Sequence, residues 1–251
     1  MRVDAVVLAG ARNDGRLRHV SSAPYEALIE IGDRVMVDYV LAALRRCSLI
    51  NRIVVAGPDE LRTRVTTCGV EFTSAGDSMI ESIRVATEYL DSKDKVLLVT
   101  GDIPLITEEA ILDFLHRCQK VQADIYYPVV RRVTNESKYP GVRRTYMHLK
   151  EGVFTGGNLV LLQPAIVAQC HDLIDQAIQL RKKPRQLAKL LGGRAFFKLL
   201  FRQLSIKEIE ARVNEVLGFV GVAIVSLYPE VGIDVDKPTD LEMARQVLEN
   251  R

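Results

Sequence analysis

The sequence has no tryptophan, few cysteines and no long apolar run. The four cysteines are single residues, at Cys47, Cys68, Cys118 and Cys170. Because no two of them form a Cys-x-x-Cys pair, neither a zinc site nor a disulfide framework is indicated. No apolar run reaches the roughly 18 residues of a membrane span, and no signal-peptide profile precedes the first apolar segment. We therefore expect a cytoplasmic protein without a transmembrane segment.

An excess of charge of one sign is also missing. Lys and Arg exceed Asp and Glu by only 2 among 251 residues, which argues against nucleic-acid binding by the protein as a whole. The charge is unevenly spread, because residues 181–215 hold ten Lys or Arg against three Glu, or +7. The rest of the chain is therefore 2 − 7 = −5. The basic segment is compositionally a separate piece of the protein.

Short apolar runs alternate with helical spacing through the first half of the chain. Residues 5–9 and 95–100 are such runs, and residues 35–46 carry apolar side chains on one helical face. This alternation predicts right-handed βαβ units and a mostly parallel sheet. In such sheets ligands bind at the carboxyl ends of the strands, so we expect one cleft there.

Residues 10–18 follow the first apolar run and combine glycines with basic residues. The glycines are Gly10 and Gly15, and the arginines are Arg12, Arg16 and Arg18. At a strand end such a loop turns backbone N–H and guanidinium groups toward an anion, for which a nucleoside triphosphate is the obvious guest. The full Walker and Gly-x-Gly-x-x-Gly spacings are absent. For this stretch alone, an ordinary solvated loop stays open as the alternative.

Three aspartates follow predicted strands. Asp102 lies in Gly101-Asp-Ile-Pro104, while Asp234 and Asp236 lie in an extended segment where alternate side chains project to the same side. Carboxylates from separate loops facing an anion loop suit Mg²⁺, which takes further ligands from water and substrate phosphates. The alternative for Asp102 is a helix or turn cap, and Asp240 is expected to be the N-cap of the last helix.

Five motifs in order resemble one family. They are Leu8-Ala-Gly10 with Gly15-Arg16-Leu17, Gly76-Asp-Ser78-Met-Ile-Glu-Ser82, Gly101-Asp-Ile-Pro104, Thr155-Gly-Gly-Asn158 and Asp234-Val-Asp-Lys-Pro-Thr-Asp240. This order resembles the nucleotidyltransferases of the nucleotide-diphospho-sugar transferase (GT-A-like) fold, and within them the MobA-like NTP transferases. The resemblance implies a three-layer α/β/α sandwich with a mostly parallel mixed sheet. It also implies a core at 1–163, a basic helical insertion at 164–218, and a return strand, metal loop and closing helix at 219–251.

The resemblance further implies a Mg²⁺-dependent transfer of an NMP group from an NTP to a phosphorylated acceptor, with release of pyrophosphate. GTP or CTP is preferred as the donor, and the acceptor is not specified. Arg16 and Asp102 would be catalytic, and Asp102, Asp234 and Asp236 would hold the metal. The nucleotide would contact Leu8, Ala9, Gly10, Arg12, Gly15, Gly76, Ser78 and Ser82. The acceptor would face Gly156, Gly157 and Asn158.

One departure from the family pattern concerns Glu26. The family has Pro-Lys-x-Leu after the loop, with the lysine on the phosphates, whereas this chain has Tyr25-Glu-Ala-Leu28. A negative charge near a triphosphate is unfavourable. Three alternatives stay open: an arginine of the loop supplies the charge, Glu26 helps to hold a metal, or the protein is a regulatory protein or pseudoenzyme that binds nucleotides without transferring them. A Rossmann-type oxidoreductase is disfavoured by the incomplete glycine fingerprint.

The basic segment, residues 181–212, lies outside the resemblance. Its apolar residues on helical spacing are Phe196, Phe197, Leu200, Phe201 and Leu204. It is either a helical lid with a solvated basic face, or an element that contacts an anionic or lipid-linked acceptor or an acidic membrane surface. Nearby, Arg143 and Arg144 are adjacent on an expected strand, so at most one of them faces the cleft.

Overall fold

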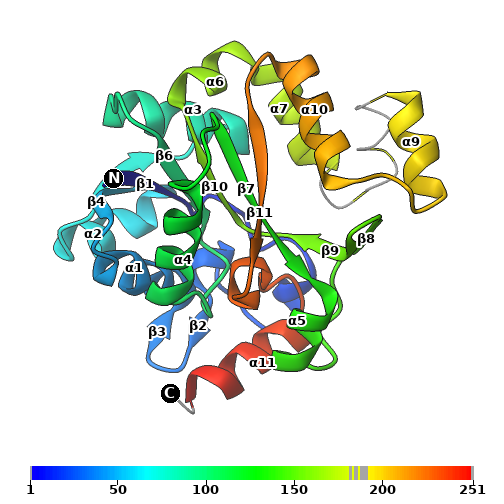
Figure 1. The fold of residues 1–251 in the computed structure, drawn as a ribbon. Helices are drawn as coiled ribbons and strands as arrows, with labels where there is room; N and C mark the ends of the chain where they lie inside the picture. Colours follow the sequence, from blue (N-terminus) through cyan, green and yellow to red (C-terminus); the bar gives the residue numbers. More distant parts are fainter. Residues whose placement is uncertain (1, 181–182, 184–185, 187–191, 250–251) are drawn as a thin grey trace.

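The computed structural model describes residues 2–180, 183, 186 and 192–249, which form one large sheet with helices on both faces (Figure 1). The strands of this sheet are β1 (Val3–Leu8), β4 (Ile50–Gly57), β5 (Glu71–Ser74), β6 (Val96–Thr100), β7 (Ile125–Arg131), β8 (Met147–Leu149), β9 (Gly152–Gly156), β10 (Leu159–Leu162) and β11 (Gly221–Ser226). A separate small hairpin pairs β2 (Glu30–Ile31) with β3 (Arg34–Val35). The α/β class and the mixed sheet predicted from the sequence are confirmed.

The strand order is β5-β4-β1-β6-β10-β7-β9-β8, and β11 pairs with β7. Parallel pairs join β1 to β4 and β6, β4 to β5, and β7 to β11. Strand β10 runs antiparallel to both β6 and β7, so β1, β6, β7 and β11 all point the same way. The carboxyl ends of these strands therefore share one edge of the sheet, where ligands are expected to bind.

Two apolar layers separate the sheet from its helices. One layer is covered by α1 (Met36–Arg46), α2 (Asp59–Thr67) and α4 (Glu108–Cys118). The other is covered by α3 (Met79–Leu90), α6 (Pro164–Gln169) and α7 (His171–Leu180). In α1 the residues Val37, Val40, Leu41 and Leu44 are buried, as their i, i+3, i+4, i+7 spacing predicts. The result is the expected three-layer sandwich.

Local capping chemistry fixes where two of these helices start. Ser78 is the N-cap of α3 and accepts a hydrogen bond from the N–H of Glu81 at 3.2 Å. Thr107 is the N-cap of α4 and accepts from the N–H of Ala110 at 3.2 Å. Each cap satisfies a backbone donor that has no partner inside its helix.

The second half of the chain departs from the sequence expectations in two places. An additional helix, α5 (Arg132–Lys138), follows β7, and the next strand is only Met147–Leu149, so Arg143 and Arg144 do not lie on a strand as expected. In the segment before β8, the side chain of Arg144 donates to carbonyl groups of Gly232 and Asp234.

The helices between β10 and β11 end with α9 (Gly193–Leu200) and α10 (Ile206–Leu217), and α11 (Pro238–Glu249) closes the chain. Residues 181, 182, 184, 185 and 187–191 of the basic segment lie outside the described residues. The division at 163 and 218 stays a prediction. Within the part of the chain that the structure describes, no helix is long and apolar enough to cross a membrane.

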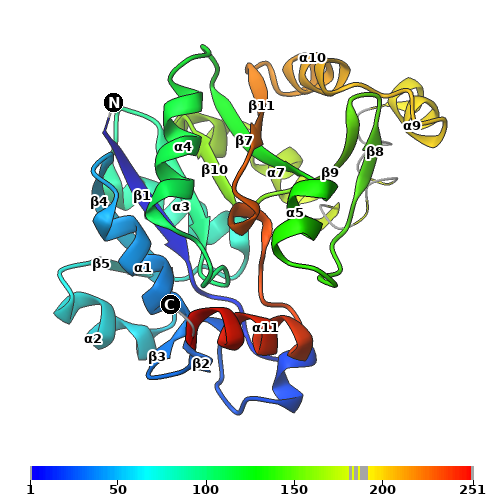
Figure 2. The same ribbon diagram turned by 60° about the horizontal axis from the view of Figure 1, so that its bottom comes forward.

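A third apolar cluster lies below the ligand edge of the sheet, between α11 and residues 17–36 (Figure 2). Leu17, from the short helix η1 (Arg16–His19), is fully buried in it. Ile233 and Val235 reach the same cluster from the segment after η3 (Pro229–Gly232). This shared packing fixes residues 10–18, here called the first loop, relative to residues 232–236, here called the aspartate segment.

Candidate active site

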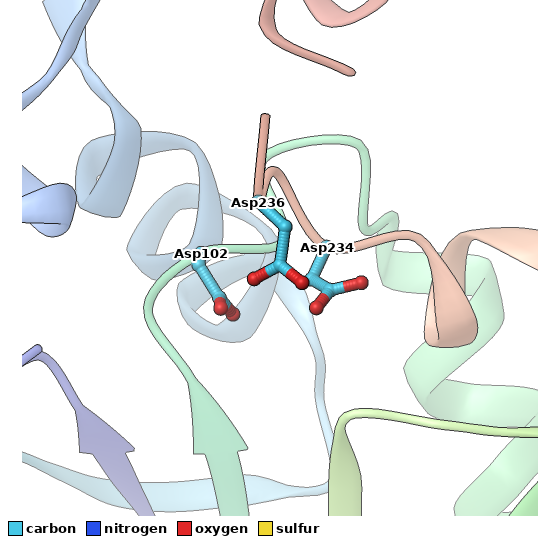
Figure 3. A group of neighbouring side chains, drawn as sticks. All are labelled: Asp102, Asp234 and Asp236. Atoms are coloured by element: carbon cyan, nitrogen blue, oxygen red, sulfur yellow. The ribbon is translucent and has the colours of Figure 1, made fainter. Parts of the chain in front are cut away.

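Three carboxylates meet at the carboxyl edge of the sheet. Asp102 follows β6, and Asp234 and Asp236 lie between η3 and α11; each offers a ligand oxygen within 4.8 Å of the other two. Figure 3 shows the three side chains turned toward one another from these two segments. The two segments are joined directly, because the N–H of Val235 donates to the carbonyl of Asp102 at 2.9 Å.

The alternation of the extended segment explains how two of its aspartates reach the site. Val235 points into the third apolar cluster and is fully buried, so its neighbours Asp234 and Asp236 are turned the other way, toward Asp102. The sequence prediction that Asp234 and Asp236 share a side agrees with this geometry.

Arg144 is a buried clamp on the aspartate segment. Its guanidinium forms an ion pair with the Asp234 carboxylate, and both side chains are only 8% exposed. The Nε of Arg144 also donates to the carbonyl of Gly232 at 2.8 Å, and Nη1 donates to the carbonyl of Asp234 at 3.3 Å. One side chain therefore fixes both the backbone and the carboxylate of this segment.

These residues fit a divalent cation on three counts. The formal charge of three carboxylates and one guanidinium is −3 + 1 = −2, which one divalent ion balances. Two oxygens on opposite sides of Mg²⁺ lie about 4.2 Å apart at a ligand distance of about 2.1 Å, so oxygens within 4.8 Å need only small movements. Carboxylate oxygen is also the hard donor that Mg²⁺ prefers.

Asp240 is excluded from this group by its own contacts, although it is not an N-cap as expected. It lies in the first turn of α11, where its carboxylate accepts from the N–H of Asp236 at 3.3 Å and pairs with Lys237 at 3.3 Å. The side chain is only 2% exposed, and this burial raises the pKa of the Asp240 carboxyl. Its role is to shape the turn that carries Asp236.

The loop at residues 10–18 is held from inside and charged on the outside. The amide of Asn13 donates to the carbonyls of Ser21 and Ala23 at 3.0 and 2.9 Å, which closes the loop on itself. The predicted anion-binding arginines of the loop are Arg12, Arg16 and Arg18. All three are exposed, and none forms an ion pair with a described residue. Their charge is therefore available to an anion.

The loop that follows β5 touches the first loop. A Cβ on Gly10 would lie 2.9 Å from the Cβ of Ala75, so only glycine allows this approach. The hydroxyl of Ser82 accepts from the N–H of Gly76 at 3.0 Å and donates to the carbonyl of Ser78 at 2.9 Å. Both serines are predicted to contact the nucleotide. In this structure the hydroxyl of Ser82 forms hydrogen bonds within its own loop, and that of Ser78 caps α3.

The segment predicted to face the acceptor is packed between β7 and η3. The N–H of Gly157 donates to the carbonyl of Pro128 at 2.8 Å, and that of Asn158 to Val231 at 2.7 Å. A Cβ on Gly157 would lie 2.7 Å from the ring of Pro128, so the glycine here has a packing reason. The carbonyl of Asn158 accepts from the N–H of Thr100, which ties the segment to β6.

Comparison with known proteins decides the family. The MobA-like NTP transferase domain matches residues 5–197. The chain belongs to the MobA-like NTP transferase family. The assignment drawn from the five sequence motifs is confirmed.

Two solved structures are similar to this chain. A solved structure described as a hypothetical transferase from Thermus thermophilus is 36% identical with a TM-score of 0.81, over 96% of this chain and 100% of its own. A CMP:2-keto-3-deoxy-manno-octonic acid synthetase complexed with CTP aligns over 100% of this chain and 99% of its own, with a TM-score of 0.63. At 12% identity this second likeness shows the fold alone.

The bifunctional protein GlmU of Staphylococcus epidermidis (strain ATCC 35984) is 22% identical over 186 residues. The match covers 65% of this chain and 40% of that protein, so the chain corresponds to less than half of this curated relative.

For a MobA-like NTP transferase, the position of Glu26 is notable. Glu26 opens η2 (Glu26–Leu28), is half-buried, and its N–H donates to the carbonyl of Ala11 at 3.0 Å. The residue that replaces the family's lysine is therefore attached to the first loop. Arg144 is the residue of the site that the sequence does not single out from the pair Arg143–Arg144, because its partners lie about 90 residues further along the chain.

Proposed function

We propose that this MobA-like NTP transferase is a Mg²⁺-dependent nucleotidyltransferase that moves an NMP group from an NTP to a small phosphorylated acceptor. The observation that supports it best is the convergence of the Asp102, Asp234 and Asp236 carboxylates at the ligand edge of the sheet. The CTP that the octonic acid synthetase holds makes CTP, with GTP, a first choice among donors.

In the proposed reaction, an oxygen of the acceptor phosphate attacks the α-phosphorus of the NTP, and the bond to the β-phosphate oxygen breaks. Pyrophosphate leaves, and the NMP group is joined to the acceptor through a new phosphate–phosphate bond. A phosphate monoester is mostly ionised at neutral pH, so no protein base is required for the attack. The protein's task is positioning and charge neutralisation.

The residues divide this task between two segments. The exposed arginines Arg12, Arg16 and Arg18 neutralise the triphosphate from the first loop. Asp102, Asp234 and Asp236 would hold Mg²⁺, which supplies charge neutralisation at phosphate oxygens when bound. Arg144 keeps Asp234 oriented and restrains the segment through the carbonyl of Gly232.

The test is pyrophosphate release, measured with each of the four NTPs against a panel of sugar and polyol phosphates, with and without Mg²⁺. A turnover that requires both Mg²⁺ and one acceptor, with a product whose mass is the sum of NMP and acceptor less one water, supports the proposal. Asp102→Asn should lower the rate by about 10²–10³-fold. The matched control is Asp172→Asn, on a side chain that is 94% exposed in α7. Equal rates in the two variants would reject the role of Asp102.

Glu26 favours a second candidate, a nucleotide-binding regulatory protein of the same fold. The backbone N–H of Glu26 is hydrogen-bonded to the first loop, and its carboxylate stands at the position where the resemblance implies a lysine. This candidate predicts that the protein binds an NTP in a Mg²⁺-dependent way. It also predicts that no pyrophosphate is released from the NTP, whichever acceptor is added. Glu26→Lys should then create or raise turnover, whereas in an active transferase that uses the loop arginines it should not.

A further inference from the structure

Helix α9 carries two apolar faces, and one is already covered. Its inner face packs Leu199 against the β8–β9 hairpin, in a cluster that contains Leu149, Phe154 and Leu204. Leu199 is 9% exposed and Leu204 is 2% exposed. Phe196 also packs on this cluster, and its ring meets that of Phe197 edge to face at a centroid distance of 5.7 Å. These contacts account for how α9 is held on the molecule.

Two residues of α9, Phe197 and Leu200, and its C-cap Phe201 form a stripe of large apolar side chains, which we call the α9 stripe. Their exposed fractions are 60%, 49% and 68%. The spacing i, i+3, i+4 places all three on one side of the helix. In Figure 1 the helix stands at the periphery, away from the sheet. Isolated exposed apolar residues are ordinary, but contiguous ones mark an interaction surface.

Three basic residues lie close to this stripe along the chain. Arg194, Arg202 and Lys207, here called the basic rim, are exposed, and none forms an ion pair with a described residue. The neighbouring Lys198 is engaged, because it pairs with Glu208, and its hydrogen bond contributes most to lowering the pKa of Glu208 to about 2. The backbone of Arg202 adopts φ +57°, a conformation that is unfavourable for any residue with a Cβ and that favours glycine.

We propose that the α9 stripe and the basic rim dock the protein on the surface of an anionic phospholipid bilayer. Interfacial helices combine an apolar face that enters the lipid with basic groups that meet the headgroups. Duplex nucleic acid would use the rim but leave the phenylalanines in water. A second copy of the same surface would bring like charges together. Since no described helix crosses a membrane, the contact is peripheral.

The basic rim and the α9 stripe should contribute separately to the affinity for vesicles, and variants of each measure the two contributions. Each basic residue near an anionic surface adds about 1 kcal/mol, or about fivefold in partitioning. Arg202→Gln should therefore weaken binding about fivefold, and Arg45→Gln, on an exposed arginine of α1, should leave it unchanged. The double variant Phe197→Ser/Phe201→Ser should weaken it about tenfold or more. Val133→Ser, on a side chain that is 70% exposed in α5, is the matched control.

The experiment is co-sedimentation of the full chain with vesicles of phosphatidylcholine alone or mixed with phosphatidylglycerol, at low and high salt. The expected result is binding to the mixed vesicles only, lowered by salt and by the α9 variants but not by their controls. Thermal melting confirms that each variant is folded. No sedimentation with mixed vesicles, equal binding to neutral vesicles, or equal loss in the controls would overturn the proposal. A change of oligomeric state in the α9 variants without any vesicle binding would assign the stripe to protein contact instead.

Discussion

Replacing Arg144 by methionine tests the clamp on the aspartate segment. Methionine keeps most of the apolar stem but leaves the Asp234 carboxylate, 8% exposed, without its guanidinium partner. Removing one partner of a buried ion pair costs about 3–5 kcal/mol. Asp234 lies at the edge of the sheet rather than deep inside, so we expect the lower end, about 3 kcal/mol.

The assay is urea unfolding together with the melting temperature. For a chain of this size, about 1 kcal/mol shifts Tm by about 2–4 °C, so Arg144→Met should lower it by about 6–12 °C. Arg143→Met is the matched control, because Arg143 is exposed and forms no ion pair with a described residue. The control should stay within about 0.5 kcal/mol of the wild type.

A double-mutant cycle separates the ion pair from the contacts of Arg144 with backbone carbonyls. Asp234→Asn removes the buried charge, so the double variant Arg144→Met/Asp234→Asn should be less destabilised than the sum of the single variants. Equal losses in Arg144→Met and Arg143→Met, or a cycle that is strictly additive, would refute the clamp.

Three further predictions concern other parts of the molecule. Gly157→Ala should destabilise the protein by about 1–3 kcal/mol, because its Cβ would lie 2.7 Å from Pro128 and 3.0 Å from the carbonyl of Val231; Gly193→Ala, with no atom within 4 Å, should not. Hydrogen bonds from Arg52 at 2.8 and 2.7 Å lower the pKa of the Glu71 carboxyl. Glu71→Gln should therefore lower the free energy of unfolding, measured in urea at neutral pH, by about 1 kcal/mol. This difference from the wild type should vanish as the pH falls through the pKa of Glu71 in the folded protein. Cys68 is exposed, whereas burial raises the pKa of Cys118 to about 12, so a maleimide should label Cys68 in the native protein and spare Cys118 until urea is added; fast native labelling of Cys118 would contradict the packing.

Local chemistry explains which parts of the fold were predictable. The run at residues 5–9 became β1, and the caps Ser78 and Thr107 fixed the starts of α3 and α4, because each signal depends on neighbours within a few residues. The gathering of Asp102 with the 234–236 segment was also predictable, since parallel strands place their carboxyl ends at one edge.

What the sequence did not reveal depends on distant contacts. Whether Arg143 or Arg144 turns inward is decided by contacts with the carbonyls of Gly232 and Asp234, about 90 residues away in the sequence. The hydroxyl of Ser82 looks like a ligand group in the sequence, yet its partners are Gly76 and Ser78 within its own loop. Residue type indicates what a side chain can bind, and the packing decides what it does bind.

The central claim is that the aspartates and the arginine loop together bind a metal–nucleotide complex, and isothermal titration tests it most directly. GTP, CTP, UTP and ATP are titrated with and without Mg²⁺ into the wild type, Asp102→Asn and the control Asp172→Asn. The account predicts Mg²⁺-dependent binding of at least one NTP, weakened at least about tenfold by Asp102→Asn and unchanged by Asp172→Asn. Three results would contradict the account: NTP binding with the same affinity with and without Mg²⁺, undiminished NTP binding by Asp102→Asn, and no binding of any NTP.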